Sequence, residues 1–157
     1  MTDVHNSATR SRNMAAIKGK NTRPELWLRQ RLHRRGFRYR LNVSKLPGKP
    51  DLVFPRYKAV IFVHGCFWHM HQCPLFRLPA TRTEWWEQKL IQNRQRDLAE
   101  QDKLREMGWR ILLVWECAIK GRRKIPEAEL LAQVVEWLKN SSFYTELPVP
   151  DNEQTTT

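Results

Sequence analysis

The spacing of apolar and polar residues predicts an N-terminal helix followed by a strand. Thr22-Arg-Pro-Glu25 has the spacing of a capping box with Pro in the first turn. Leu28 and Leu32 lie one turn apart, and Gly36 is placed to end the helix. Residues 37–41 alternate between apolar and polar, which predicts a strand directly after the helix.

The remainder of the chain predicts further strands and two more helices. Residues 51–54 and 59–63 read as adjacent strands, and the second is apolar throughout, as a buried central strand is. A long helix is predicted from Thr81-Arg-Thr-Glu84, a second capping-box spacing, to Gly108. Residues 109–115 predict another buried strand and residues 127–139 an amphipathic helix.

This order of elements predicts one α/β domain, a mixed central sheet flanked by helices. We expect the domain to span residues 1–140, with a basic arm at residues 1–21 that includes a short helix over 11–18. Residues 64–79 show no helical or strand period and are rich in His, Cys and aromatic residues. Residues 141–157 are polar and predict a mobile tail.

Net positive charge is concentrated in the first third of the 157-residue chain. Residues 1–50 hold 13 Lys and Arg against Asp3 and Glu25, whereas residues 51–157 hold 15 against 14 acids. Such a basic segment favours a polyanionic partner, with nucleic acid first; a solvated basic helix is the plainer alternative. The chain contains no apolar run of about 18 residues and no apolar N-terminal signal, so we expect a cytoplasmic protein.

The three cysteines predict a structural zinc site. Cys66-x4-His71-x-Cys73 places two thiolates and an imidazole close together. If strand 109–115 lies parallel to strand 59–63, Cys117 reaches the same sheet end and completes a Cys3His set, which leaves no open position on zinc. The alternatives are three reduced cysteines without metal, and His69 in place of His71 as ligand.

A second candidate metal site lies at Pro50-Asp51, where a strand begins after a Gly/Pro turn. The pair resembles the Pro-Asp half of the PD-(D/E)xK nuclease motif, in which the Asp binds Mg²⁺. The next strand, residues 60–64, holds neither the acid nor the lysine of the second half. Taken alone, the Pro-Asp pair favours the plainer interpretation, a turn aspartate that caps its own backbone.

Several segments together resemble one known family, the very short patch repair (Vsr) endonucleases, from about Ser7 to Leu138. The segments that carry the resemblance are Pro47-Gly-Lys-Pro-Asp51, Val63-His-Gly-Cys-Phe-Trp-His69 with His71 and Cys73, Pro79-Ala-Thr-Arg-Thr83 with Trp86, Arg96-Asp97, and Gly108-Trp-Arg-Ile-Leu-Leu-Val-Trp-Glu-Cys117.

The resemblance implies a restriction-endonuclease-like fold with a degenerate PD-(D/E)xK pattern. It implies an enzyme that nicks double-stranded DNA 5′ to the thymine of a T·G mismatch, the product of 5-methylcytosine deamination. A cognate cytosine methyltransferase and mismatch-repair factors would act in the same pathway, and a monomer suffices. Asp51 would hold Mg²⁺ with the main-chain carbonyl of Val63.

The resemblance also implies roles for other residues. His69 would activate the attacking water, with His64 near the scissile phosphate, while Asp97 and Glu25 would orient waters or ligands. Phosphodiester hydrolysis needs a Lewis acid and a base that works near neutral pH, which fits a carboxylate with histidine. The plainer readings are a capping residue for Glu25, packing for His64 and a surface charge for Asp97.

In the family the aromatic residues Phe67, Trp68 and Trp86 would form an intercalating platform, with Met14 approaching from the minor groove. A wobble pair stacks poorly, which lowers the cost of inserting such a wedge. The alternative for Trp86 is a core position, since one of Trp85 and Trp86 is expected to be buried.

Two other functions fit parts of the pattern. A non-catalytic, zinc-stabilised mismatch sensor would keep the basic surface and the wedge but would not need Asp51 and His69. A zinc hydrolase of small molecules, with His64, His69 and His71 as ligands, leaves the basic segment and the cysteines unexplained.

Overall fold

The computed structural model describes residues 22–150. The basic arm at residues 1–21, its predicted helix and Met14 lie outside the described residues, as do residues 151–157. The first described helix, α2, spans Arg23–Arg34 and confirms the prediction for this segment. The Thr22 hydroxyl accepts a hydrogen bond from the N–H of Glu25 at 3.4 Å, so the N-cap forms as the sequence indicates.

The central sheet is mixed, in the order β1-β2-β3-β4-β5. Its first three strands pair antiparallel, whereas β3 with β4 and β4 with β5 pair parallel. The strands are β1 Arg40–Leu41, β2 Leu52–Phe54, β3 Ala59–His64, β4 Arg110–Trp115 and β5 Tyr144–Leu147, and a 3₁₀ turn, η1 Pro55–Tyr57, joins β2 to β3. A mixed sheet with helices on both faces confirms the predicted α/β domain.

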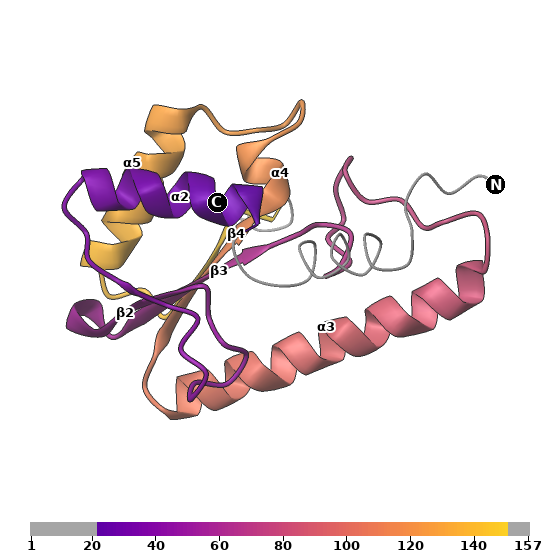
Figure 1. The fold of residues 1–157 in the computed structure, drawn as a ribbon, viewed down its shortest axis with the longest axis horizontal. Coiled ribbons are helices and arrows are strands. Elements are labelled where there is room, and N and C mark those ends of the chain that lie inside the picture. The colour runs from indigo at the N-terminus through magenta and orange to yellow at the C-terminus, as the bar shows by residue number, and fades with distance from the viewer. Residues whose placement is uncertain (1–21, 151–157) are drawn as a thin grey trace, which may run out of the picture.

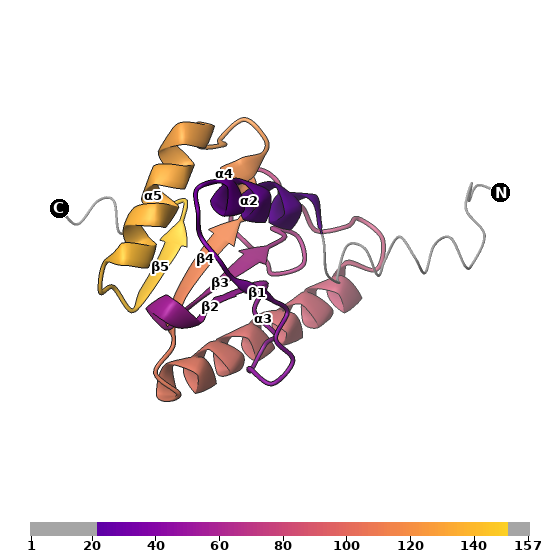
Figure 2. The same ribbon diagram turned by 60° about the vertical axis from the view of Figure 1, so that its left-hand side comes forward.

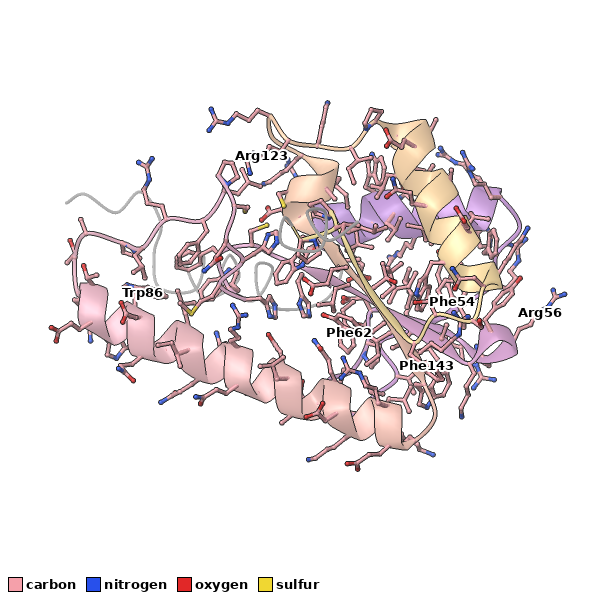
Figure 3. All side chains as sticks on the ribbon, turned by 180° about the vertical axis from the view of Figure 1, so that it is seen from behind. Phe54, Arg56, Phe62, Trp86, Arg123 and Phe143 are labelled. Carbon is pink, nitrogen blue, oxygen red and sulfur yellow. The ribbon has the colours of Figure 1, made fainter. Side chains whose placement is uncertain are left out.

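Helices cover both faces of the sheet, which explains why its central strands are apolar throughout. α2 and α5 (Glu127–Lys139) lie over one face, and the long helix α3 (Thr83–Glu106) lies along the other (Figures 1 and 2). Phe54 packs in the core on the α2 and α5 side, and Phe62 packs in the core on the α3 side (Figure 3). Within residues 22–150, no helix is long and apolar enough to cross a membrane.

Two predictions about local structure are corrected. Only Arg40–Leu41 of the strand expected over 37–41 pairs with a neighbour. No capping box forms at Thr81, because residue Arg82 precedes α3 in a left-handed conformation and caps it without a side-chain hydrogen bond. The Thr83 hydroxyl instead donates to the carbonyl of Pro79 at 2.8 Å.

The largest correction concerns the expected tail. Tyr144–Leu147 forms β5, which pairs with β4 along its length, from Ile111 with Tyr144 to Val114 with Leu147. A short helix, α4 Glu116–Ile119, also follows β4 directly and was not predicted. As an edge strand, β5 buries only Leu147 fully, so its sequence lacks the apolar run that marks a buried strand.

Candidate active site and metal centre

The candidate site lies at the end of the sheet where the two parallel strands β3 and β4 finish. His64, the last residue of β3, is in register with Trp115, the last residue of β4. β2 runs antiparallel to β3, so Asp51, directly before β2, comes to the same end. A cleft of about 890 Å³ opens there, and its lining includes Asp51, Val63, His64, His69 and Asp97.

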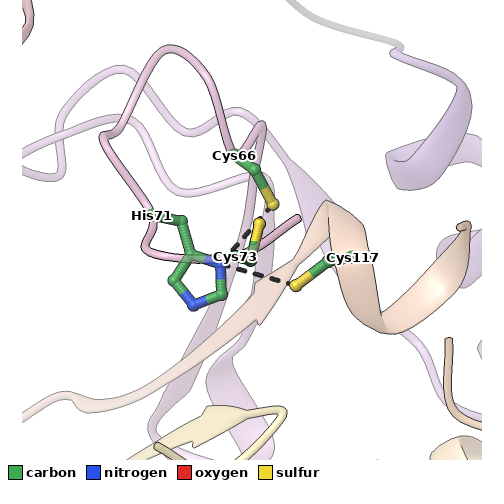
Figure 4. Close-up of side chains that lie close together, drawn as sticks. All are labelled: Cys66, His71, Cys73 and Cys117. Carbon is green, nitrogen blue, oxygen red and sulfur yellow. Dashed lines mark hydrogen bonds between the residues drawn. The ribbon is translucent and has the colours of Figure 1, made fainter. Parts of the chain in front are cut away.

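The four predicted zinc ligands meet beside this cleft (Figure 4). The Nδ1 atom of His71 lies 3.6 Å from the Sγ of Cys66 and 3.4 Å from the Sγ of Cys117. With Cys73, all four donor atoms lie within 4.8 Å of one another. Tetrahedral zinc with Zn–S near 2.3 Å and Zn–N near 2.0–2.1 Å requires ligand-to-ligand distances of about 3.5–3.8 Å. The cluster therefore fits a tetrahedral ion.

The chemistry of the thiols supports the same assignment. The pKa of Cys66 lies above its usual range, because its hydrogen bond with Cys117 and its burial both disfavour the thiolate. Burial also raises the pKa of Cys73. A divalent cation at the centre of the cluster would stabilise the thiolates that the protein alone disfavours. The structure places His71, and not His69, with the cysteines.

Asp51 is held at the cleft by the backbone of β3. The N–H of Val63 donates to the Asp51 carboxylate at 2.7 Å. Burial, and to a smaller extent the neighbouring Glu25, raise the pKa of Asp51 to about 7, although the hydrogen bond from Val63 opposes the shift. A buried carboxylate next to a second carboxylate is an arrangement that a cation would stabilise.

Glu25 reaches the same region from the first turn of α2. Its side chain is almost fully buried and pairs with Arg29 one turn later at 2.7 Å. The helix N-cap uses the backbone N–H of Glu25, whereas its carboxylate pairs with Arg29 and lies close enough to Asp51 to raise the pKa of that residue. The capping and cleft interpretations of Glu25 are therefore compatible.

His69 forms a charge-assisted pair with α3. Its Nδ1 lies 2.5 Å from the Oδ2 of Asp97, and both side chains are about three-quarters or more buried. With Nδ1–H donating to the carboxylate, Nε2 is the atom that can accept a proton. Asp97 is thus a partner of His69 and not the isolated surface charge of the plainer interpretation.

His64 stacks against His69, with the two imidazole ring centroids 3.8 Å apart and an angle of 3° between the ring planes. Burial lowers the pKa of His64, and the neighbouring His69 and His71 lower it further, so the ring is neutral. Its buried Nδ1 has no hydrogen-bond partner among the described residues. Because an imidazole binds a metal in its ring plane, two stacked parallel rings cannot both ligate one ion, which speaks against a metal shared by His64, His69 and Asp97.

Aromatic side chains cluster where the loop that carries Cys66, His71 and Cys73 lies against the start of α3. The ring centroids of Phe67 and Trp68 lie 5.0 Å apart, and the ring of Trp86 lies 5.5 Å from that of Phe67 and 6.0 Å from that of Trp68. Trp85 is 47% exposed and Trp86 is half-buried, at the end of α3 that extends past the sheet (Figure 3). The expectation that one of these two tryptophans is a core residue is therefore wrong.

Comparison with known proteins decides the family. The family model for the DNA mismatch endonuclease Vsr matches residues 2–75. The chain is 48% identical to the DNA mismatch endonuclease Vsr of Escherichia coli (strain K12) over 138 residues, which covers 88% of both chains. The chain belongs to the Vsr family.

Two further relatives of this Vsr-family chain have names that describe nicking enzymes. The type II nicking enzyme V.NmeAIP of Neisseria meningitidis is 40% identical over 78% of this chain and 87% of its own. The type II nicking enzyme V.XorIIP of Xanthomonas oryzae pv. oryzae is 44% identical over 76% of this chain and 88% of its own.

The structure of this Vsr-family chain adds cleft residues that sequence reasoning missed. Glu116 accepts the N–H of Cys66 at 3.1 Å and pairs with Lys120 at 2.8 Å. Both residues line the cleft, whose cations are Arg23, Lys49, Lys89, Arg96 and Lys120. Glu116 stands within the Val-Trp-Glu-Cys string, but the short helix α4 that brings it to Cys66 leaves no periodic signal in the sequence.

Proposed function

We propose that the chain is a DNA endonuclease that hydrolyses the phosphodiester bond 5′ to the thymine of a T·G mismatch, with Mg²⁺ as cofactor, and so initiates very short patch repair. Membership of the Vsr family and the names of the relatives support a DNA endonuclease. The observation that carries the proposal is that Asp51 and the His69–Asp97 pair enter one cleft from different elements, next to a partly exposed aromatic cluster.

Asp51 and the carbonyl of Val63 would hold Mg²⁺. The N–H and C=O of one strand residue point to the same edge, so the Val63 carbonyl faces the side on which its N–H meets Asp51. The raised pKa of Asp51 supports a cation here, because its charge is poorly compensated. Bound Mg²⁺ would stabilise the negative charge that develops on the phosphate during hydrolysis.

His69 would act as general base. Asp97 accepts its Nδ1–H and leaves Nε2 to take a proton from water. Neutral His64 supports the His69 ring by stacking and lines the cleft, where it would lie near the scissile phosphate. Glu25, buried beside Asp51, would orient water or the metal.

Phe67, Trp68 and Trp86 would read the mismatch as a wedge. Their rings contact one another beside the cleft and are not part of the core clusters. Inserting aromatic side chains costs a few kcal/mol of unstacking, and a T·G wobble lowers that cost relative to T·A. Met14 and the basic N-terminal arm would bind the same DNA, whose phosphates attract the excess of Lys and Arg.

The zinc site would have a structural role and no part in catalysis. Its four protein ligands leave no position for substrate. Cys66 and Cys73 bracket Phe67 and His69, so one ion would fix both the wedge and the base. All proposed groups come from one chain, which supports a monomer as the active unit, working after a cytosine methyltransferase whose products deaminate.

The test is a duplex with one T·G mismatch in a cytosine-methylation context, labelled on the thymine strand. The proposal predicts nicking with Mg²⁺, none without divalent cation, and none by Asp51→Ala, while a surface control, Asp102→Ala, cuts like the wild type. Equal cutting of a T·A duplex would overturn the mismatch specificity. Tight, T·G-selective binding without any cutting would favour the non-catalytic sensor.

A further inference from the structure

The C-terminal strand β5 contributes a carboxylate to the interior of the site region. The indole N–H of Trp115 donates to Oε1 of Glu146 at 2.8 Å. The second oxygen, Oε2, accepts the hydroxyl of Tyr144 at 3.0 Å. A hydrogen bond to a carboxylate is stronger than one between neutral groups, so Trp115 is held firmly at the end of β4.

The ring of Trp115 touches the three histidines of the site region. It stacks face to face with His71 at 4.0 Å and 7°. It also meets His64 edge-on at 5.4 Å and His69 at 6.4 Å. One indole therefore stacks on a candidate zinc ligand and also makes edge contacts with both rings of the His64–His69 stack.

The surroundings of Trp115 leave room for it to move. A second hollow of about 650 Å³ borders Trp115 on the side of α3 and β5, and its lining includes Glu146, Tyr144 and Gln101. Without the bond to Glu146, the indole can tilt toward this space, because no close-packed side chain fills it. Such a tilt would remove the surface against which His64 and His69 are aligned.

We propose that Trp115, held by Glu146 of β5, is a positioning residue that aligns His69 with the cleft. This inference rests on the proposed role of His69 as general base. It also assigns a function to residues 144–147, a segment that the sequence predicts to be part of a polar tail. Displacement of a reacting group by about 1 Å can slow a reaction about 100-fold. Loss of the hydrogen bonds that support a site residue lowers activity about 10- to 100-fold.

The experiment removes the hydrogen bond from either side and then restores it. Glu146→Ala removes the acceptor and Trp115→Phe removes the donor while keeping an aromatic ring. Single-turnover nicking of a T·G duplex at saturating enzyme is expected to fall about 10- to 100-fold in each. The Kd for the duplex and the zinc content are expected to match the wild type. Glu146→Gln keeps an acceptor oxygen and is expected to recover most of the rate.

Two controls separate positioning from general stability. Thr145→Val alters the neighbouring residue of β5, whose hydroxyl contacts Ser142 at 3.3 Å, and is expected to nick at the wild-type rate. The double variant W115F/E146A is expected to be no slower than the slower single variant, since both changes break one bond. Wild-type nicking by Glu146→Ala, additive rates in the double variant, or loss of zinc in Glu146→Ala would each overturn the proposal.

A readout independent of catalysis separates this inference from the proposed function. Imidazole NMR resonances of His64, His69 and His71 in the DNA-free protein are expected to shift in Glu146→Ala and not in Thr145→Val. If the wild type does not nick, the proposed function fails while these shifts still test the alignment. Unchanged histidine resonances in Glu146→Ala would overturn the positioning role by themselves.

Discussion

Binding of Mg²⁺ to this Vsr-family chain should be linked to a proton on Asp51. The carboxyl has a pKa of about 7, because it is buried beside Glu25. A metal ligand must be deprotonated, so the apparent affinity scales with the ionised fraction. That fraction is about 0.09 at pH 6 and about 0.91 at pH 8 for a pKa of 7. Mg²⁺ should therefore bind about tenfold more weakly at pH 6 than at pH 8.

Calorimetric titration of the DNA-free protein with Mg²⁺ checks this, because it is independent of the ionisation of His69 during catalysis. In buffers of different ionisation enthalpy, binding should release about 0.9 proton at pH 6 and about 0.1 at pH 8. Glu25→Gln removes a neighbouring negative charge and should move the midpoint to lower pH. Asp51→Asn should abolish the proton-linked binding, whereas the exposed Asp102→Asn should leave it unchanged.

The same shift has a consequence for stability without Mg²⁺. The folded pKa of Asp51 lies above its unfolded value near 3.9. The protonated carboxyl is therefore favoured by folding, and stability is lost as the pH rises from about 4 to 7. Asp51→Asn should melt at a higher temperature than the wild type at pH 8 and at a similar one near pH 4. Equal Mg²⁺ affinity at pH 6 and pH 8, with no proton release, would show that Mg²⁺ binding is not linked to a proton on Asp51.

Three other changes have defined outcomes. Cys73→Ala should lose zinc in elemental analysis and melt about 10 °C lower, as expected for a loss of ~3 kcal/mol in a chain of this size. The neighbouring control Gln72→Ala should keep one zinc. A stable, zinc-free Cys73→Ala variant that binds DNA normally would contradict the structural role of zinc. Asp97→Asn should slow single-turnover nicking about 100-fold, or about 2.7 kcal/mol, with unchanged duplex affinity; an unchanged rate would show that His69 works without its partner. Phe67→Ala with Trp68→Ala should erase the preference for T·G over T·A at normal zinc content, and survival of the preference would exclude the wedge.

Much of the core was predictable because both faces of its central strands are covered. Strands β3 and β4 are apolar at nearly every position, and α2 and α5 bury regularly spaced leucines. β5 was not predictable from its pattern, because an edge strand of sequence Tyr-Thr-Glu-Leu buries one residue and resembles a polar tail. Its place beside β4 depends on a pairing that no local signal encodes.

Which residues gather at the candidate site could be predicted in part from the sequence, whereas their hydrogen-bond partners could not. The short spacings from Cys66 to Cys73 indicated a metal cluster, and the structure brings His71 and Cys117 into it. Sequence spacing could not decide between His69 and His71, because in an irregular loop the side chains of residues two apart have no fixed orientation relative to each other. The backbone of Met70 between them has a positive φ of 53°, which is unusual for a non-glycine residue.

The most direct test of the central claim maps the cut on a T·G duplex with each strand labelled in turn. We expect one Mg²⁺-dependent cut, at the bond 5′ to the mismatched thymine, on the thymine strand alone, and none in the matched T·A duplex. Cuts on both strands, or equal cutting of the matched duplex, would contradict it.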